Sequence, residues 1–308
     1  MIGDTLVYCT VGDDAYALRS TDVRQIVRVE RMRECGATDG RVGTIDMAGS
    51  TAPVFPLGRA LGHATRPAPP GHHVVLTGGD DDLIGWLVDR VERTPIDDET
   101  VVAPLPPMVG ARALRWFTAI VRTADRSVLL MAPRGANTFA RANSQVCDTS
   151  ANATARVSTD RPPAPILVFA TKALPHAEVS RFALSCRRVV AVAQDVALTV
   201  VPGSNHHVAG LAWWRDAVMP VINFRGRSTS EGAMRRRCLV ARGSERLGAA
   251  YIGLPVDSDI AMHQPRTEDL QAADVACPPF AVGVFDVGGS QPVALLNLDA
   301  LFSLKEES

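Results

Sequence analysis

The sequence predicts a mostly β protein built as an internal duplication. Its apolar runs are short and rich in valine, and clusters of Gly, Asp and Pro separate them at strand-plus-turn intervals. A glycine precedes a Pro-Val strand by the same interval in two places, Gly43–Leu57 and Gly210–Phe224. Self-similarity at such a long period indicates two copies of one domain rather than a solenoid of short repeats. Several short strands in each half of a copy favour small barrels.

The correspondence between the copies extends well beyond these two segments. In the first copy it includes Tyr16–Leu18 with Val23 and Ile26, Val74–Leu76, Gly85, Phe117–Ile120 and Val128–Met131. Their partners in the second copy are, in the same order, Phe182–Leu184 with Val189 and Val192, Cys238–Val240, Gly248, Phe280–Gly283 and Val293–Leu296.

The strands of the first copy are expected at Leu6–Val11, Val23–Val29, Val74–Leu76, Ile84–Val88, Ile120–Val121 and Val128–Met131. Hairpin turns are expected at Asp13–Asp14 and Gly78–Asp82, because Gly and Asp tolerate the positive φ that such turns require. In the second copy, the periodicity of Val189–Val201 fits either a strand or a short buried helix.

A chain of 308 residues agrees with two domains of about 150 residues each. The predicted bounds are residues 1–135 for the first module, 136–164 for a flexible linker and 165–304 for the second, more diverged module. The linker is predicted because the sequence there is rich in Ala, Asn, Ser, Thr and Arg and ends in a proline-rich stretch. Shorter breaks at residues 65–71 and 226–232 divide each module into two parts.

Composition excludes several classes of protein. The 32 basic and 33 acidic residues leave no net field that would attract nucleic acid or an anionic membrane. The six cysteines are widely spaced without a CxxC pair, which indicates reduced thiols rather than a zinc cage or a disulfide framework. The amino terminus resembles no signal peptide, and no apolar run approaches the about 18 residues of a spanning helix. We therefore expect a cytoplasmic protein.

The sequence contains no motif for a catalytic, cofactor or metal site. It has no Gly-rich phosphate loop, no nucleophile elbow and no zinc helix. The pairs His72–His73 and His206–His207 are expected near strand starts, where neighbours point to opposite faces and cannot readily chelate one ion. Asp80–Asp82 fits a solvated turn, and Arg235–Arg237 a solvated strand entry. The expectation is a non-enzyme without cofactor or metal.

The ordered set of segments resembles the CheW-like domain family, which includes the coupling protein of bacterial chemosensory arrays and the end of its histidine kinase. The matching segments of the first copy are Tyr16–Leu18, Val23–Val27, Gly43–Gly49, Pro53–Leu57, Leu61–Gly62 and Gly85–Asp89. Those of the second copy are Phe182–Leu184, Val189–Val192, Pro202–Gly203, Gly210–Asp216 and Pro220–Phe224. The resemblance implies that each module is a pair of five-stranded SH3-like barrels with few short helices, in which the first strands complete the second barrel.

The chain departs from the family pattern at polar positions. The acidic residue usual in the valine-rich strand is Gln25 in the first copy and Ala191 in the second. The asparagine and the arginine of the Gly-x-x-Asn-x-Arg-Gly segment become Asp46 and Ala48 in the first copy, whereas the second has Trp213 and Arg215, followed by Asp216. Asp89 is kept in the first copy, and the spacing aligns it with Ile252.

These positions supply the candidate partner-binding residues: Gln25, Ile26, Asp46, Trp213, Trp214, Arg215 and Asp216. Gln25 is expected to point outward, where a neutral amide in place of a carboxylate would remove a charge-assisted hydrogen bond of about 1.5–3 kcal/mol. Alternation along a strand sends one of the two tryptophans inward and the other outward. Trp and Arg are enriched in interface hot spots. In the alternative, neighbouring loops cover both rings.

The resemblance implies a non-catalytic scaffold of bacterial two-component signalling. Its partners would be the regulatory domain of a CheA-type histidine kinase and the cytoplasmic tips of methyl-accepting chemoreceptors, at membrane-associated arrays. The alternative is a diverged regulator of a chemosensory pathway that does not control chemotaxis, in which one module is structural or dimerising. An enzyme built on small barrels is a third hypothesis, for which the sequence offers no nucleophile-base pair.

Overall fold

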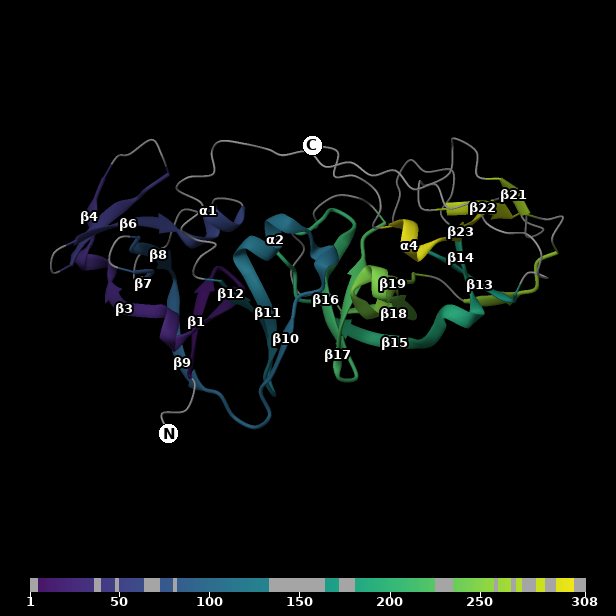
Figure 1. The fold of residues 1–308 in the computed structure, drawn as a ribbon, viewed down its shortest axis with the longest axis horizontal. Coiled ribbons are helices and arrows are strands. Elements are labelled where there is room, and N and C mark those ends of the chain that lie inside the picture. Colours follow the sequence, from purple (N-terminus) through teal and green to yellow (C-terminus); the bar gives the residue numbers. More distant parts are fainter. Residues whose placement is uncertain are drawn as a thin grey trace. The chain divides into compact units, whose positions relative to one another are not determined.

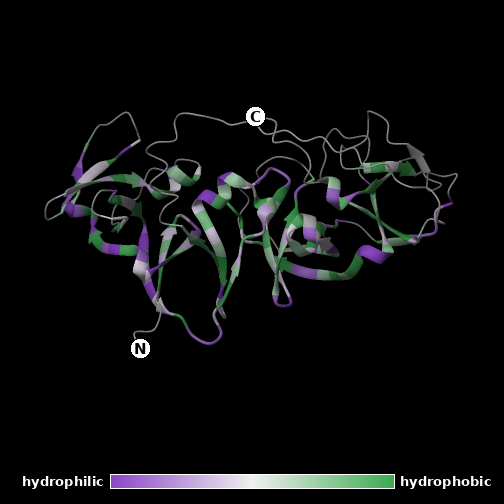
Figure 2. Ribbon diagram, in the orientation of Figure 1, coloured by the Kyte–Doolittle hydropathy of each residue, from purple (hydrophilic) through white to green (hydrophobic). Residues whose placement is uncertain are grey.

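The computed structural model describes residues 5–35, 40–47, 50–63, 73–79, 82–132, 164–171, 181–224, 235–257, 260–266, 270–272, 281–285 and 292–301 (Figure 1). Contacts divide the chain into two compact units. The first comprises Met1–Leu105, Gly110–Cys147 and Val201–Ser204, and the second comprises Pro106–Val109, Asp148–Val200 and Asn205–Ser308. In the described residues both units are mainly β-strand, as predicted, and Figure 2 shows the strands largely in the green of hydrophobic residues.

One sheet of the first unit has the strand order β10-β11-β12-β2-β1-β9. Its strands are β1 (Thr5–Val11), β2 (Asp14–Arg19), β9 (Arg90–Pro95), β10 (Val101–Pro104), β11 (Phe117–Arg122) and β12 (Ser127–Met131). Neighbours are antiparallel except β2 and β12, which are parallel. The first hairpin of the chain therefore joins strands from the end of its copy, as the family resemblance predicted.

The other sheet of the first unit has the order β3-β7-β8-β6-β5-β4. Its strands are β3 (Val23–Arg28), β4 (Arg33–Glu34), β5 (Gly43–Met47), β6 (Ser50–Pro56), β7 (His73–Thr77) and β8 (Ile84–Val88). The short helices of this part of the chain are η1 (Ser20–Asp22), η2 (Val29–Arg31), α1 (Leu57–Leu61), η3 (Pro107–Val109) and α2 (Ala111–Trp116).

This second sheet is closed into a barrel by one stretch of chain. The two edge strands, β3 and β4, are separated only by η2, and they pair with β7 and β5 respectively. The barrel therefore has five strands if the bent β3-η2-β4 stretch is counted once. Its core consists of Val27, Ile45, Ala52, Val54, Val74, Leu76 and Leu83. We call residues 23–33 the closing segment of the first copy.

The sheet that contains β1 is curled as well. Its edge strands β9 and β10 are joined by the short connection Ile96–Thr100. A flat sheet of six strands would hold its edges roughly 24 Å apart. That is more than the roughly 20 Å that such a connection can reach. Leu6, Tyr8, Ala17, Ala119, Val121, Val128 and Leu130 fill the concave side.

An aromatic layer connects the two sheets of the first unit. Trp86 of β8 lies 5.6 Å from Trp116 of α2 and 6.2 Å from Phe55 of β6, measured between ring centroids. The buried Trp86 indole N–H donates a hydrogen bond of 3.0 Å to the Thr77 hydroxyl, so its one polar group is satisfied. Edge-to-face and tilted ring pairs of this kind add to the apolar burial that holds the sheets together.

The second unit repeats this topology in two sheets with the orders β20-β13-β14-β23-β22-β21 and β15-β18-β19-β17-β16. The strands are β13 (Ile166–Ala170), β14 (Arg181–Ser185), β15 (Val189–Ala197), β16 (Val208–Trp214), β17 (Ala217–Ile222), β18 (Arg235–Ser244), β19 (Ala249–Pro255), β20 (Ala261–His263), β21 (Leu270–Ala272), β22 (Ala281–Phe285) and β23 (Val293–Leu296). The short helices are η4 (Cys186–Arg188), η5 (Glu245–Leu247) and α4 (Leu298–Leu301). Parallel pairs recur at β14/β23 and β17/β19.

The ambiguous stretch Val189–Val201 is a strand over most of its length, because β15 pairs with β18 along nearly its whole course. Beyond β15, Thr199 forms a bridge with Leu211 of β16 through N–H···O contacts of 2.7 and 2.8 Å. This bridge closes the second barrel at the same place as β4 closes the first. Residues 189–199 are thus the closing segment of the second copy.

The strand registers correct one alignment made from sequence spacing. Gly85 pairs with Val54 and Leu76, and the residue with the equivalent pairs, to Val221 and Val240, is Gly253. The expected match of Gly85 to Gly248 is therefore wrong. The β18–β19 hairpin is longer than the β7–β8 hairpin, and Gly248 lies in its turn with φ 60°.

Candidate partner-binding surfaces

Gln25 faces the interior of its barrel, contrary to the expectation that it points outward. It shares a face of β3 with Val27, which belongs to the barrel core, because alternate residues of a strand lie on one side. The second copy agrees, since Ala191, at the equivalent register position, packs against the core of its own barrel. Gln25 is half-buried.

Ile26 lies on the outer face of the first barrel. It is directly opposite Val75, which is opposite Trp86 of the aromatic layer. In the second copy Val192 takes this position, opposite Leu239. Val192 is 39% exposed and Ile26 is half-buried. Each residue therefore sits at the rim of the apolar layer between the two sheets of its copy.

Asp46 is exposed at the end of β5 and already has partners within the chain. Its carboxylate forms an ion pair of 2.9 Å with the Arg33 guanidinium and accepts a hydrogen bond of 3.2 Å from the Thr51 hydroxyl. Arg33 belongs to β4, whereas Gln25 and Ile26 belong to β3. The first-copy candidates therefore do not form one cluster: Gln25 and Ile26 lie near the start of the closing segment, and Asp46 of β5 contacts its last residue, Arg33.

The candidates of the second copy form a single hairpin. Trp213 and Trp214 end β16, Arg215 and Asp216 form the exposed turn, and β17 follows. Figure 2 shows this turn in purple. Arg215 has φ 54°, an uncommon conformation for a residue with a side chain. Its guanidinium carbon lies 5.8 Å from the centre of the Trp214 ring, within the range of a cation–π contact.

The two tryptophans lie on opposite faces of β16, as alternation predicted. Trp214 packs against the core of the second barrel. Trp213 is therefore on the outer face, where it pairs across the sheet with Val218. Both are half-buried. Ala48, the first-copy counterpart of Arg215, lies outside the described residues.

Sequence spacing missed an acidic residue in the second copy. The register that equates Gly85 with Gly253 also equates Asp89 with Asp257, so the alignment of Asp89 with Ile252 is wrong. The sequence Gly253–Asp257 carries the Gly-x-x-Val-Asp pattern of the family, which could have revealed the match. Both copies therefore keep this aspartate at the end of the equivalent strand.

A second missed feature joins β2 to the residue after α1. The Tyr16 hydroxyl and the His63 Nε2 atom are hydrogen-bonded at 2.7 Å, and His63 Nδ1 lies 3.3 Å from an Asp14 carboxylate oxygen. Burial raises the pKa of Tyr16 well above its ordinary value, and the nearby Asp14 carboxylate adds to that increase. The second copy has Phe182 at the position of Tyr16, so this hydrogen-bonded chain is specific to the first copy.

His206 and His207 lie in a turn before β16, so the argument that strand alternation separates their rings does not apply. The ring centroids are 3.9 Å apart. Burial, and then the neighbouring His206, lower the pKa of His207 to about 4. Within the described residues, no three His, Cys, Asp or Glu side chains are grouped so that they could hold a metal ion. His72 and Asp80–Asp81 lie outside that part of the chain.

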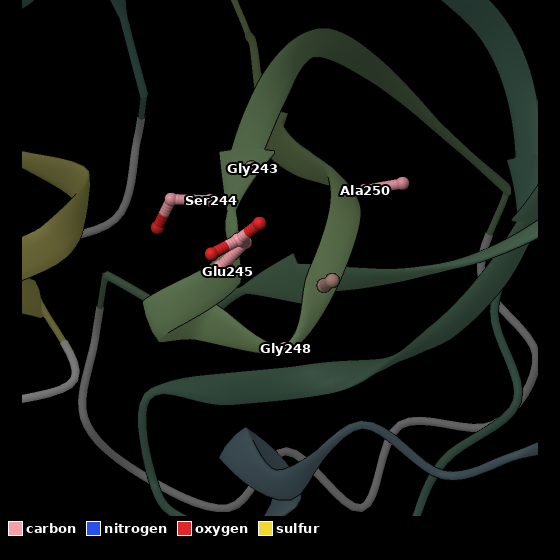
Figure 3. Close-up of a pocket in the computed structure, with 6 residues that line it drawn as sticks. Gly243, Ser244, Glu245, Gly248 and Ala250 are labelled. Carbon is pink, nitrogen blue, oxygen red and sulfur yellow. The ribbon is translucent and has the colours of Figure 1, made fainter.

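A shallow pocket of about 480 Å³ lies on the β18–β19 hairpin (Figure 3). Its lining consists of Gly243, Ser244, Glu245, Gly248, Ala249 and Ala250. The Ser244 hydroxyl donates a hydrogen bond of 2.7 Å to Asp299, which also pairs with Arg188 at 2.8 Å. The lining thus offers one carboxylate, that of Glu245, among small residues and backbone. Such a pocket does not converge polar groups on a ligand.

The described helices are all short, and none of them is long and apolar enough to cross a membrane. The candidate partner-binding residues lie on strand faces, at strand ends and in hairpin turns. Surfaces of this kind contact other proteins through side chains and sheet edges.

Comparison with known proteins places the chain in a family. The model of the CheW-like domain matches residues 5–135 and again residues 176–306. No protein with a curated function matches the chain. Among solved structures, the chain is similar to the scaffolding protein TtCheW from Thermoanaerobacter tengcongensis, with 21% identity over 42% of this chain and 90% of that one and a TM-score of 0.37. Because the two family matches include most of the sequence, the chain belongs to the CheW-like domain family and carries its domain twice.

Proposed function

We propose that the chain is a non-catalytic scaffold that connects the regulatory domain of a CheA-type histidine kinase to the cytoplasmic tips of methyl-accepting chemoreceptors. The observation that carries the proposal is the double match to the CheW-like domain, in a chain whose candidate sites are surfaces for protein contacts. Two domains in one chain can hold two partners together. The location that follows is the cytoplasm, at receptor arrays.

The proposed organisation is a first module at residues 1–135, a linker at 136–164 and a second module at 165–304. A tether of this length brings the second binding event to an effective concentration on the order of millimolar. A scaffold with two modest affinities would then retain both partners. The gain requires that both modules can bind at the same time.

The contact surfaces that support this function are the rims with Ile26 and Val192 and the hairpin with Trp213, Trp214 and Arg215. An aliphatic side chain at the edge of an apolar layer suits a partner helix that presents its own apolar face. Trp and Arg side by side form the kind of anchor that carries much of an interface's binding energy. Asp216, next to Arg215, would add charge selectivity at the same tip.

The full chain should be tested by calorimetry against two partner fragments, the regulatory domain of a CheA-type kinase and the cytoplasmic tip of a methyl-accepting chemoreceptor. We expect micromolar binding to at least one fragment. Truncation at Val192→Ala or Arg215→Ala is expected to weaken binding about fivefold or more. The matched control is Val102→Ala, which truncates another exposed valine on β10. Absence of binding to both fragments would reject the coupling function.

A diverged regulator with one structural module is the second candidate. The observation that favours it is the Asp46 carboxylate, which is occupied by Arg33 and Thr51 within its own chain. In that case only the second module would hold an external partner, and Arg215→Ala would abolish binding while Ile26→Ala had no effect. Sedimentation of the full chain would show whether the first module mediates a dimer.

A further inference from the structure

The closing segments of the two copies match in length and position. Val23 pairs with Thr77 and Val189 with Ala241 at their starts, and Arg33 pairs with Thr44 and Thr199 with Leu211 at their ends. A register shift follows the first residue in both. The registers of the two segments are therefore equivalent from Val23 to Val27 and from Val189 to Ala193; a second register shift, before Val196, occurs in the second segment alone.

Their charges are opposite. The closing segment of the first copy contains four arginines and one glutamate, a formal charge of +3, and that of the second contains one aspartate, a formal charge of −1. The charged residues are Arg24, Arg28, Glu30, Arg31 and Arg33 in the first segment and Asp195 in the second. Val190 follows Val189 as Arg24 follows Val23, and Gln194 follows Ala193 as Arg28 follows Val27, at the point where β15 has its second register shift.

The arginines surround the outward residue of the first barrel. Arg24, Ile26 and Arg28 alternate along β3 and share its outer face. Arg24, Arg28 and Arg31 are exposed, and Ile26 between them is half-buried. We call these four residues the basic rim. It combines an aliphatic centre with cations on both sides.

The strand that pairs with β3 adds no negative charge to the basic rim. Strand β7, which pairs with β3, carries no acidic residue, and Arg28 lies opposite His73. In the described part of the chain, Arg28 and Arg31 form no ion pair, whereas Arg33 is held by Asp46. Exposed like charges close together produce a local positive potential that attracts an acidic surface and speeds encounter with it.

We propose that the basic rim docks an acidic protein surface that also presents an aliphatic side chain to Ile26. This inference rests on the proposed scaffold function, and it assigns the acidic partner to the closing segment of the first copy, because the closing segment of the second copy carries no arginine. Nucleic acid is disfavoured, since an aliphatic residue at the centre of the rim supplies no base stacking and the whole chain carries a net charge of −1.

The test uses the full chain and fluorescent poly-L-glutamate, a probe that does not depend on knowing the natural partner. We expect binding that weakens about tenfold between about 50 and about 200 mM NaCl, because salt screens exposed charges. The double variant Arg24→Val, Arg28→Gln installs the residues found at the same sequence offsets in the closing segment of the second copy. It is expected to weaken binding about tenfold.

A matched control removes two exposed charges elsewhere in the same unit. Arg90→Gln, Arg93→Gln on β9 changes the net charge equally and should leave binding within about twofold. The reciprocal variant Val190→Arg, Gln194→Arg should create a second site for the probe. Circular dichroism confirms the fold of each variant.

Two results would overturn the proposal. The first is equal binding of poly-L-glutamate by the wild type and Arg24→Val, Arg28→Gln; the second is tighter rim-dependent binding to a duplex oligonucleotide or to phosphatidylserine vesicles. Failure of the scaffold function is separable, because a chain that binds poly-L-glutamate through the rim but neither signalling fragment keeps this inference and loses only those partners.

Discussion

Asp89 and Asp257 hold the same position in the two copies, and each connects the two sheets of its copy. The Asp89 backbone N–H donates to the Thr10 carbonyl at 2.8 Å, and the Asp257 N–H donates to the Ala170 carbonyl at 3.0 Å. The Asp89 carboxylate accepts from the Gly12 N–H at 2.7 Å, and that of Asp257 accepts from the Thr171 hydroxyl at 3.2 Å. The end of one sheet is thereby fixed to the first strand of the other.

Asp257→Ala is expected to lower the free energy of unfolding by about 1–2 kcal/mol, because the Thr171 hydroxyl, in a residue only 4% exposed, loses its acceptor. Urea denaturation followed by circular dichroism measures the change. The control Asp216→Ala removes an exposed carboxylate from the β16–β17 turn and should have little effect. Equal stability of both variants would show that the Thr171 hydrogen bond contributes nothing.

Tyr16→Phe is expected to lower the free energy of unfolding by about 0.5–1.5 kcal/mol, because the His63 Nε2 atom loses its hydrogen bond to the Tyr16 hydroxyl. The aromatic ring at position 16 keeps its stacked contact with Phe117. Tyr8→Phe is the matched control, since the buried Tyr8 hydroxyl has no hydrogen-bond partner in the described residues. Thermal unfolding should show a lower Tm for Tyr16→Phe and an unchanged or higher Tm for Tyr8→Phe. The reverse order would contradict the assignment.

Alkaline pH is expected to destabilise the first unit through Cys9. Burial raises the pKa of this thiol from 9.0 to about 12. Above pH 9 the unfolded chain releases the proton that the folded chain keeps, so each further pH unit lowers the free energy of unfolding by up to about 1.4 kcal/mol. Cys9→Ala should flatten this dependence in urea titrations from pH 8 to about 10.5. An unchanged slope would mean that other groups cause it.

Acidic pH is expected to destabilise the second unit through protonation of His207. Burial, and then His206, depress its pKa from 6.5 to about 4, so the unfolded chain takes up a proton in this range before the folded chain does. The stabilisation is complete above pH 6.5 and is lost as the pH falls towards 4. Because the side chain is partly exposed, we expect a loss of only about 1–2 kcal/mol. His207→Gln should remove this pH dependence, whereas His263→Gln should retain it.

Arg215→Gly is expected to raise the stability of the β16–β17 hairpin by about 1 kcal/mol, since glycine adopts φ 54° without the steric penalty of a side chain. If Arg215 anchors a partner, the same variant binds the signalling fragments more weakly. Stability and affinity would then change in opposite directions. Asp195→Gly is the control that should gain stability and keep its affinity, because Asp195 is the other non-glycine residue with positive φ in the described part of the chain.

The duplication and the barrels were predictable because they depend on patterns that repeat. The glycine and Pro-Val spacing at Gly43 and Gly210 survives as equivalent strand registers. The orientation of Gln25 was not predictable, since apolar residues flank it on both faces of the strand at Val23, Ile26 and Val27. Only the pairing of β3 with β7 after its register shift decides which face is inside.

The length of the β18–β19 hairpin explains why sequence spacing matched Gly85 to Gly248 instead of Gly253. Gly248, a glycine at positive φ in the turn of the longer β18–β19 hairpin, has the sequence spacing expected of the strand glycine, which is Gly253. The contact between Tyr16 and His63 was equally hidden, because it joins positions 47 residues apart that only the fold brings together. That residues 189–199 close the second barrel could not be predicted either, because hydrophobic periodicity does not show which strands a segment pairs with.

The length of the barrel-closing segment is constrained by the barrel, whereas the residues on its outer face are free to change. Because the segment must reach from one edge of a sheet to the other, an insertion or deletion within it would break hydrogen bonding at both ends at once. Substitution on its outer face disturbs neither end. The two copies accordingly differ in arginine content, four in one segment and none in the other, while the lengths of the segments are equal. A duplicated domain of this kind can change its choice of partner through surface substitutions alone, on a strand whose length is fixed by the barrel.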